Sequence, residues 1–304
     1  MLTYPKEFEH IVEKAKSVDR PRKVAVVGAN SANILQGVFA AQEAGFAEPI
    51  LIGNFRKTKE MLEELGLADR DYDFYPVNNN GNPVQFAIEM IGAGSADVLM
   101  RGNIMTRDFL LPVMNKTNHL IKEGRLVTHI NVMKCDEYDR LLAISDCTLL
   151  VEPSIEQREE VIRNMVEALK NFGIEKPNIA LLSLVEKPSF HMRDTVEAQT
   201  IVMHHNEEPI ADCNLFGPIT YDLIISKEAA DLKHYECEYS GKFDGIVVPN
   251  LLAGNLICKF WDAHLHGYAC SVLTGTTIPV ALSGRSESPA HSFLSLAGAI
   301  AMFK

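Results

Sequence analysis

Three loops of this sequence combine anion-binding residue types with a place just before a predicted helix. The loop richest in donors runs from Leu282 to Pro289, and proline suits the first position of a helix. Its polar or small members are Ser283, Gly284, Arg285, Ser286 and Ser288. A guanidinium, several hydroxyls and a helix N-terminus in one turn suit a phosphate group. The alternative interpretation is that Ser288 only caps the helix and that Arg285 makes a surface ion pair.

The other two loops also stand between an apolar run and a predicted helix. In the first, Arg101 and Arg107 flank a helix N-terminus that we expect Thr106 to cap. In the second, Pro249–Asn255, the expected cap is Asn250. Open α/β sheets bind ligands at the carboxyl ends of their strands, so the three loops together predict an anion site.

The elements that must position these loops follow a strand–helix rhythm. The apolar runs do not alternate with polar residues, which is typical of parallel strands buried on both faces. The predicted strands include residues 23–27, 49–52, 97–100, 126–133, 179–184, 245–248 and 279–282. The sequence therefore predicts an α/β fold.

One stretch departs from this rhythm. Residues 140–144 and 148–151 are two apolar runs separated by a short turn, which leaves no room for a crossover helix. We expect an antiparallel insertion or a sheet edge at this point. Ser154 and Gln157 then predict a capping box at the start of the next helix.

Two further motifs have contexts that disfavour a functional interpretation. Gly92 and Gly94 follow a predicted helix, whereas a dinucleotide-binding loop follows a strand, so we interpret them as a helix stop. His264 and His266 are two positions apart, which is not one face of a helix, and no third ligand completes a metal set. No P-loop motif occurs, which disfavours a nucleotide-dependent kinase or ATPase.

Size and composition limit the remaining classes of protein. The 304 residues exceed the roughly 250 at which one core usually stops growing, so two domains or one large α/β domain are expected. The net charge of −11 disfavours nucleic acid and anionic membranes as partners. No apolar run is long enough to span a bilayer, and the six cysteines form no C-x-x-C pair. We expect a soluble cytoplasmic protein with unpaired, buried thiols.

Several of these segments also match a known family. The matching runs are residues 48–53, 96–102, 124–126, 138–142, 217–222, 249–255 and 279–288. With them the sequence resembles the phosphate acetyl/butyryltransferase family over nearly its whole length, most closely the phosphate butyryltransferase branch.

The resemblance implies an architecture shared with the isocitrate/isopropylmalate dehydrogenases. Such proteins have two three-layer α/β domains with a cleft between them, and they pair into homodimers or higher homo-oligomers. In this chain the first domain would comprise residues 1–122 plus 275–304, and the second would comprise residues 123–274.

The resemblance also implies a reaction. Family members interconvert acyl-CoA and phosphate with acyl phosphate and CoA, without a metal or a nucleotide cofactor. Arg285 matches the family arginine that follows the last strand, and Glu287 and Ser283 are the other expected catalytic residues. Arg101 would hold a phosphate. The other residues expected to contact substrate are Gly102, Thr106, Asn250, Gly254, Asn255, Gly284, Ser286 and Ser288.

The sequence departs from the acetyltransferase pattern at two positions. Gly284 replaces the serine before the arginine, and Leu111 replaces an arginine, which would favour a longer acyl chain such as butyryl. The general base is left open between Glu287, His291 and neither. Two alternatives follow: a degenerate member that binds CoA or acyl phosphate without turnover, and a metal- and NAD-dependent dehydrogenase. The latter would need an acidic cluster, which the sequence does not provide.

Overall fold

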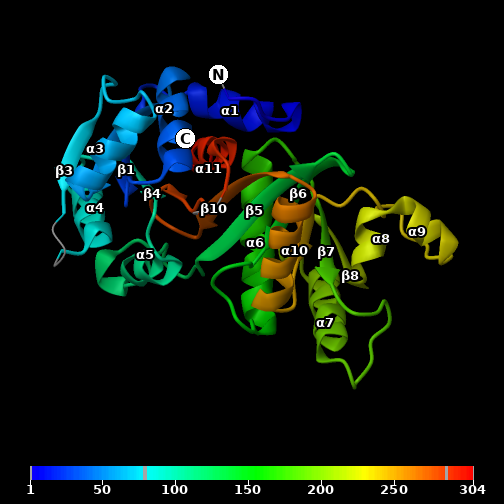
Figure 1. Cartoon of the computed structure of the whole chain (residues 1–304). Coiled ribbons are helices and arrows are strands. Elements are labelled where there is room, and N and C mark those ends of the chain that lie inside the picture. The colour runs from blue at the N-terminus through cyan, green and yellow to red at the C-terminus, as the bar shows by residue number, and fades with distance from the viewer. Residues whose placement is uncertain (1, 78–80, 285–286, 304) are drawn as a thin grey trace. The chain divides into compact units, whose positions relative to one another are not determined.

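The computed structural model describes residues 2–77, 81–284 and 287–303, which form two compact units (Figure 1). Unit 1 comprises Met1–Val127 and Ala269–Lys304, and unit 2 comprises Thr128–Tyr268. Each unit is built from strands and helices, so the predicted mixed α/β fold is confirmed. All six cysteines are buried and none forms a disulfide within the described residues, as expected. None of the helices in the described ranges has the length and apolar character that crossing a bilayer demands.

The strands of unit 1 lie in the order β3-β2-β1-β4-β11-β10. All neighbours in this series are parallel except β10 and β11, which are antiparallel. The strands are β1 (Arg22–Val27), β2 (Ala47–Gly53), β3 (Asp73–Pro76), β4 (Val98–Arg101), β10 (Tyr268–Thr274) and β11 (Val280–Ala281). The helices are α1 (Glu9–Lys16), α2 (Ala32–Glu43), α3 (Phe55–Glu64), α4 (Pro83–Gly92), α5 (Thr106–Val113) and α11 (Pro289–Ala301), with short 3₁₀ turns at Lys6–Phe8 and Lys116–Asn118.

Helix α11 is the centre of the packing in unit 1. Every residue from Ala290 to Ala301 is buried, and the helix packs on α1 and α2. The predicted strands at residues 23–27 and 49–52 are found as β1 and β2, and Gly94 at φ +70° ends α4 as predicted. Because β1, β4 and β11 are parallel neighbours, the loops that follow them emerge at one edge of the sheet.

The strands of unit 2 lie in the order β5-β6-β9-β7-β8. Strands β5 and β6 form an antiparallel hairpin, and the other neighbours are parallel. The strands are β5 (Thr128–Cys135), β6 (Tyr138–Ser145), β7 (Asn178–Leu182), β8 (Asn214–Ile219) and β9 (Gly245–Val247). The helices are α6 (Ile155–Asn171), α7 (Arg193–Glu207), α8 (Tyr221–Ile225), α9 (Lys227–Leu232) and α10 (Leu251–His264).

The antiparallel pair is real, but its predicted position is wrong. Residues 148–151 form no strand, and the partner of β6 is β5, which precedes it. After β6 the chain turns at Asp146, whose carboxylate accepts hydrogen bonds from the backbone N–H groups of residues 148–150. Those donors are thus taken by a side chain and not by a strand ladder. The predicted capping box of Ser154 and Gln157 is confirmed at the start of α6.

Gly102 lets the end of β4 approach the end of β1 closely. Its N–H donates to the Val27 carbonyl at 2.8 Å. A Cβ at this position would lie 2.5 Å from the Gly28 oxygen and 2.6 Å from the Val27 oxygen. Since both neighbours are backbone atoms, they cannot turn aside, and only glycine fits.

We expect Gly102→Ala to lower the free energy of unfolding by about 2 kcal/mol, because two strand ends must separate to admit the methyl group. The matched control is Gly92→Ala, since a Cβ at Gly92 meets nothing within 4 Å. The control should leave stability unchanged or raise it by up to about 1 kcal/mol, because alanine is the better helix former. Urea unfolding monitored by circular dichroism measures both, and equal effects would contradict this account of Gly102.

A charged contact fastens the other end of the same strands. Both terminal nitrogens of Arg20 donate to the Asp97 carboxylate at 2.7 Å, and the Lys23 N–H donates to it at 2.8 Å. Burial opposes ionisation of Asp97, but these three hydrogen bonds outweigh it and hold the pKa of this carboxyl below its usual value.

A lowered folded pKa gives stability that is present above the unfolded pKa of about 3.9 and is lost as the pH falls through the folded pKa. Asp97→Asn is therefore expected to cost about 1 kcal/mol of unfolding free energy at neutral pH. The difference from wild type should shrink below about pH 4. Urea titrations at several pH values test this, and a difference that does not change with pH would refute the ionic contribution.

Candidate functional site

The loop after β4 is held by Arg101, whose side chain points inward. The residue is only 6% exposed. Its Nε and Nη2 donate to the Ile104 carbonyl at 3.1 and 2.9 Å, and its Nη1 donates to the Ser283 carbonyl at 3.4 Å. The guanidinium thus joins two of the three predicted loops within unit 1.

Thr106 does not cap the following helix, so that prediction is wrong. It is the first residue of α5, and the N-cap position belongs to Met105, which has no side-chain acceptor. The helix begins one residue earlier than expected, because the Met105 carbonyl already accepts the first helical hydrogen bond, from the Phe109 N–H at 3.1 Å. Among the described residues, the first turn of α5 keeps N–H groups without a side-chain cap.

The loop after β11 is described except for Arg285 and Ser286, which lie outside the described residues. Ser288 accepts a hydrogen bond from the His291 N–H at 3.3 Å, and Pro289 is the first residue of α11, so the predicted cap and helix start are confirmed. Ser283 is fully buried, and its hydroxyl has no hydrogen-bond partner within the described ranges.

Glu287 folds back onto its own loop. Its Oε2 accepts a hydrogen bond from the Gly284 N–H at 2.7 Å, and its carbonyl accepts one from Asn33 Nδ2 at 2.7 Å. A Cβ at Gly284 would overlap this carboxylate. Gly284 therefore leaves the space that the inward-folded Glu287 carboxylate occupies.

The two candidate bases are neighbours. Glu287 Oε2 lies 4.0 Å from His291 Nδ1, and both side chains are largely buried. Glu287 precedes the N-cap Ser288, and His291 lies in the first turn of α11, so the turn into the helix brings the two side chains together. The structure therefore unites the two residues that the sequence leaves as alternatives.

The third predicted loop belongs to unit 2. Asn250 Oδ1 accepts a hydrogen bond from the Ala253 N–H at 3.0 Å, which confirms the predicted cap of α10. A Cβ at Gly254 would lie 2.7 Å from the Asp146 carbonyl oxygen, and Asn255 Nδ2 donates to the Cys147 carbonyl at 3.3 Å. Both contacts press the first turn of α10 against the turn that follows β6.

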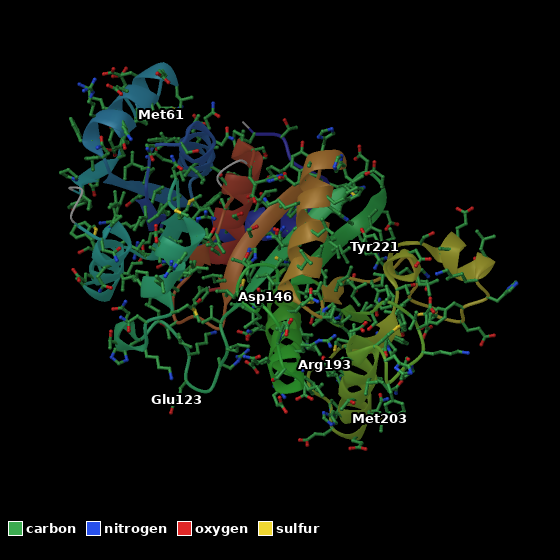
Figure 2. All side chains as sticks on the ribbon, turned by 60° about the horizontal axis from the view of Figure 1, so that its bottom comes forward. Met61, Glu123, Asp146, Arg193, Met203 and Tyr221 are labelled. Atoms are coloured by element: carbon green, nitrogen blue, oxygen red, sulfur yellow. The ribbon has the colours of Figure 1, made fainter. Side chains whose placement is uncertain are left out.

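That turn contains polar residues that the sequence analysis missed. Asp146 (labelled in Figure 2) is 3% exposed, and its carboxylate also accepts the His129 N–H at 2.6 Å. His129 Nδ1 lies 3.0 Å from Cys147 Sγ and 2.8 Å from Thr148 Oγ1. The signal in the sequence was the turn between two apolar runs, but only the fold brings His129 beside it.

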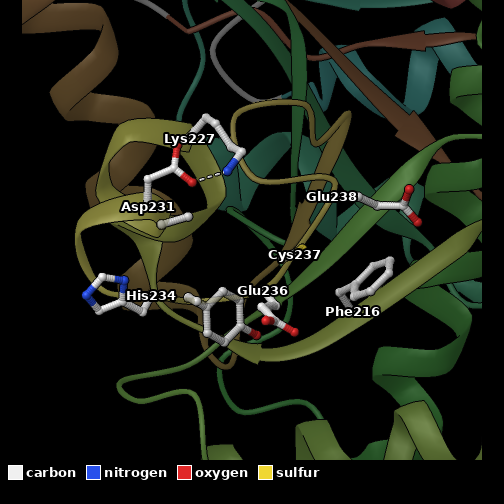
Figure 3. A pocket seen from close by; sticks show the side chains of 9 residues that line it. Phe216, Lys227, Asp231, His234, Glu236, Cys237 and Glu238 are labelled. Carbon is white, nitrogen blue, oxygen red and sulfur yellow. Dashed lines mark hydrogen bonds and ion pairs between the residues drawn. The ribbon is translucent and has the colours of Figure 1, made fainter.

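A further cavity in unit 2, of about 620 Å³, lies beside α9 (Figure 3). Lys227 and Asp231 form an ion pair at its edge, and Glu236 and Glu238 add two carboxylates. It contains no residue that the sequence analysis singled out. Among the described residues, no group of three or more histidine, cysteine or acidic side chains is arranged to hold a metal ion.

Asp146 offers a test of the turn beside α10. Asp146→Asn places an amide N–H₂ where backbone donors now meet a carboxylate oxygen, so the free energy of unfolding should fall by about 3 kcal/mol. The control is Asp212→Asn, which removes a carboxylate from an exposed ion pair with Lys170 and should cost about 0.5 kcal/mol or less. Urea unfolding compares the two, and a loss at Asp146 no larger than the control would contradict the role given to its carboxylate.

Sequence comparison places the chain among acyl-transferring enzymes. The family described as phosphate acetyl/butaryl transferase matches residues 75–297. A phosphate butyryltransferase of Clostridium acetobutylicum is 30% identical over 283 residues, which cover 93% of each chain. A phosphate acetyltransferase of Thermotoga maritima is 28% identical over 95% of this chain and 97% of its own.

Solved structures agree with these relatives. A branched-chain phosphotransacylase from Enterococcus faecalis V583 superposes with a TM-score of 0.79 at 26% identity, covering 92% of this chain and 98% of its own. A 4-hydroxythreonine-4-phosphate dehydrogenase from Burkholderia phymatum shares the fold alone, with a TM-score of 0.52 at 11% identity over 93% of this chain and 99% of its own. The extent of these matches establishes that the chain belongs to the phosphate acetyl/butaryl transferase family.

Proposed function

We propose that this protein transfers a short acyl group between CoA and phosphate. In the direction of CoA acylation, the CoA thiolate attacks the carbonyl carbon of an acyl phosphate, a C–S bond forms, and the C–O bond to phosphate breaks. The observation that carries the proposal is the family match over residues 75–297, since it includes the loops after β4, β9 and β11.

The chemistry needs a base for the thiol. A thiol with a pKa of about 8.5 is mostly protonated at neutral pH, so a nearby proton acceptor accelerates the attack. Glu287 and His291, with 4.0 Å between carboxylate and imidazole, are the described groups that suit this role. We assign the proton to this pair, because the carboxylate and the imidazole stand next to each other at the β11 loop.

The chemistry also needs positive charge where the phosphate leaves. We assign this role to Arg285, which belongs to the loop after β11 in the sequence, since a guanidinium offers two parallel N–H groups to a phosphate. Arg101 already donates to the backbone carbonyls of Ile104 and Ser283, so its guanidinium ties the two loops together. We therefore propose that Arg101 holds the loop that carries Arg285. We propose that Gly102 and Gly254 allow neighbouring backbone to approach closely, and that Gly284 leaves room for the Glu287 carboxylate.

The acyl chain is proposed to be longer than acetyl, with butyryl as the first choice. Leu111 on α5 is 58% exposed and presents an apolar side chain where acetyltransferases carry a charged one. The relatives named above include a butyryltransferase and a branched-chain phosphotransacylase, which supports the same choice. The proposal keeps the expectations of a cytoplasmic homodimer, of isocitrate/isopropylmalate dehydrogenase-type domains, and of catalysis without a metal or nucleotide cofactor.

Thiol release tests the reaction. Purified protein mixed with phosphate and acyl-CoA of two to five carbons should release free CoA, fastest with butyryl-CoA. Arg285→Ala should lower kcat by about 10²–10³ while leaving the urea midpoint unchanged, because it removes charge stabilisation only at the reacting phosphate. The control is Arg56→Ala, an 87% exposed arginine paired with Glu60 on α3.

One outcome would refute the role given to Arg285, and another would overturn the proposed acyl transfer. Full activity of Arg285→Ala would remove the assigned cation, although transfer itself would stand. No turnover with any of the acyl-CoA substrates, combined with calorimetric binding of CoA, would favour a protein that binds CoA without transferring the acyl group.

A further inference from the structure

A cavity of about 270 Å³ lies at the edge of unit 2 where the parallel strands end. Three helices begin around it, since its lining comes from the residues just before α6, the first turns of α7 and the residues just before α10. The lining residues are Glu152, Pro153, Arg193, Asp194, Glu197, Pro249 and Asn250. Converging helix N-termini favour an anion, although they do not by themselves make a binding site.

A buried arginine next to Glu197, one of the lining residues, is the second observation. Arg158 on α6 is fully buried, and none of its three guanidinium nitrogens has a hydrogen-bond partner among the described residues. A buried cation with unused donors is costly unless charge nearby compensates it. The compensating charge comes from the cavity lining, where Glu197 Oε2 lies 3.7 Å from Arg158 Nη1.

Glu197 connects this buried arginine to an exposed one. Its other oxygen, Oε1, accepts a hydrogen bond from Arg193 Nε at 2.6 Å. The Arg193 side chain is 79% exposed, and within the described ranges its two terminal nitrogens make no hydrogen bond. Figure 2 labels Arg193 at the start of α7, beside α6. Arg158 thus fixes the position of Glu197, and Glu197 orients Arg193 at the cavity. The two terminal nitrogens of Arg193 remain available to a ligand.

The cavity has three other polar side chains, which differ in what they offer a ligand. Asp194 Oδ2 accepts the Leu184 N–H at 3.0 Å, which commits that carboxylate to the loop after β7. Asn250 uses its Oδ1 to cap α10, so its Nδ2 hydrogens remain for a ligand. Glu152 is the one lining carboxylate without such a hydrogen bond among the described residues, and it opposes an anion.

We infer that this cavity binds a phosphate group of the substrate, with Arg193 as the contacting residue and Glu197 and Arg158 as positioning residues. The terminal N–H groups of Arg193 match two phosphate oxygens, which lysine could not do in the same geometry. The inference rests on the proposed function, which supplies two phosphate-bearing substrates. These are CoA, which carries phosphates on its nucleotide, and inorganic phosphate, which accepts the acyl group from acyl-CoA.

Calorimetric titration tests the inference without any turnover. Arg193→Ala should raise the Kd for CoA about tenfold if the cavity holds a CoA phosphate, or raise the Kd for inorganic phosphate if it holds that ion. Either result supports the site and identifies the substrate that supplies the bound phosphate group. Unchanged Kd values for both titrants would overturn the inference. They would do so even if the wild-type protein were shown to transfer acyl groups.

Three further variants separate binding from structure. Arg163→Ala is the matched control, because this exposed arginine of unit 2 is likewise paired with a glutamate, Glu160. It should change neither Kd. Glu152→Gln should lower the affected Kd, which is a change of opposite sign to that of Arg193→Ala. Glu197→Gln should raise the same Kd and leave little further effect for Arg193→Ala to add, with the urea midpoint checked for each protein. Additive effects of these two changes would refute the positioning role.

Discussion

The buried guanidinium of Arg101 is the contact on which the candidate site of unit 1 depends. It binds the carbonyl of Ile104 and that of Ser283, which lies 182 positions after Arg101 in the chain. A cation removed from water must find acceptors, and here they are the backbone carbonyls of two loops. Once Ser283 is held, the Gly284–Glu287 hydrogen bond and the cap of α11 follow within five residues.

A similar solution occurs in unit 2 with the opposite charge. The Asp146 carboxylate collects backbone N–H groups from its own turn and from His129. It thereby ends β6 and shapes the surface against which α10 begins. In both units a buried charge organises backbone groups at the point where strands end, which is where an α/β protein places its ligands.

Glycine at position 284 illustrates how one residue can alter the chemistry of a loop. A Cβ there would overlap the Glu287 carboxylate in its present position, so a larger residue would make the acid shift. The carboxylate then stands near His291 at the start of α11. The space beside Gly284 thus holds one member of an acid–imidazole pair, which is the basis of the roles we propose for both residues.

The sequence by itself determined the features that depend on neighbouring residues. Non-alternating apolar runs predicted the parallel strands, Ser154 with Gln157 predicted a cap, and Pro289 predicted the start of α11. It could not find the partner of β6, because strand pairing depends on contacts between residues that are distant in sequence. Nor could it place Thr106, the neighbours Glu287 and Gly284, or the chain from Arg158 through Glu197 to Arg193. Those arrangements were decided by the tertiary structure, since burying a charge forces it to find partners wherever the fold brings them.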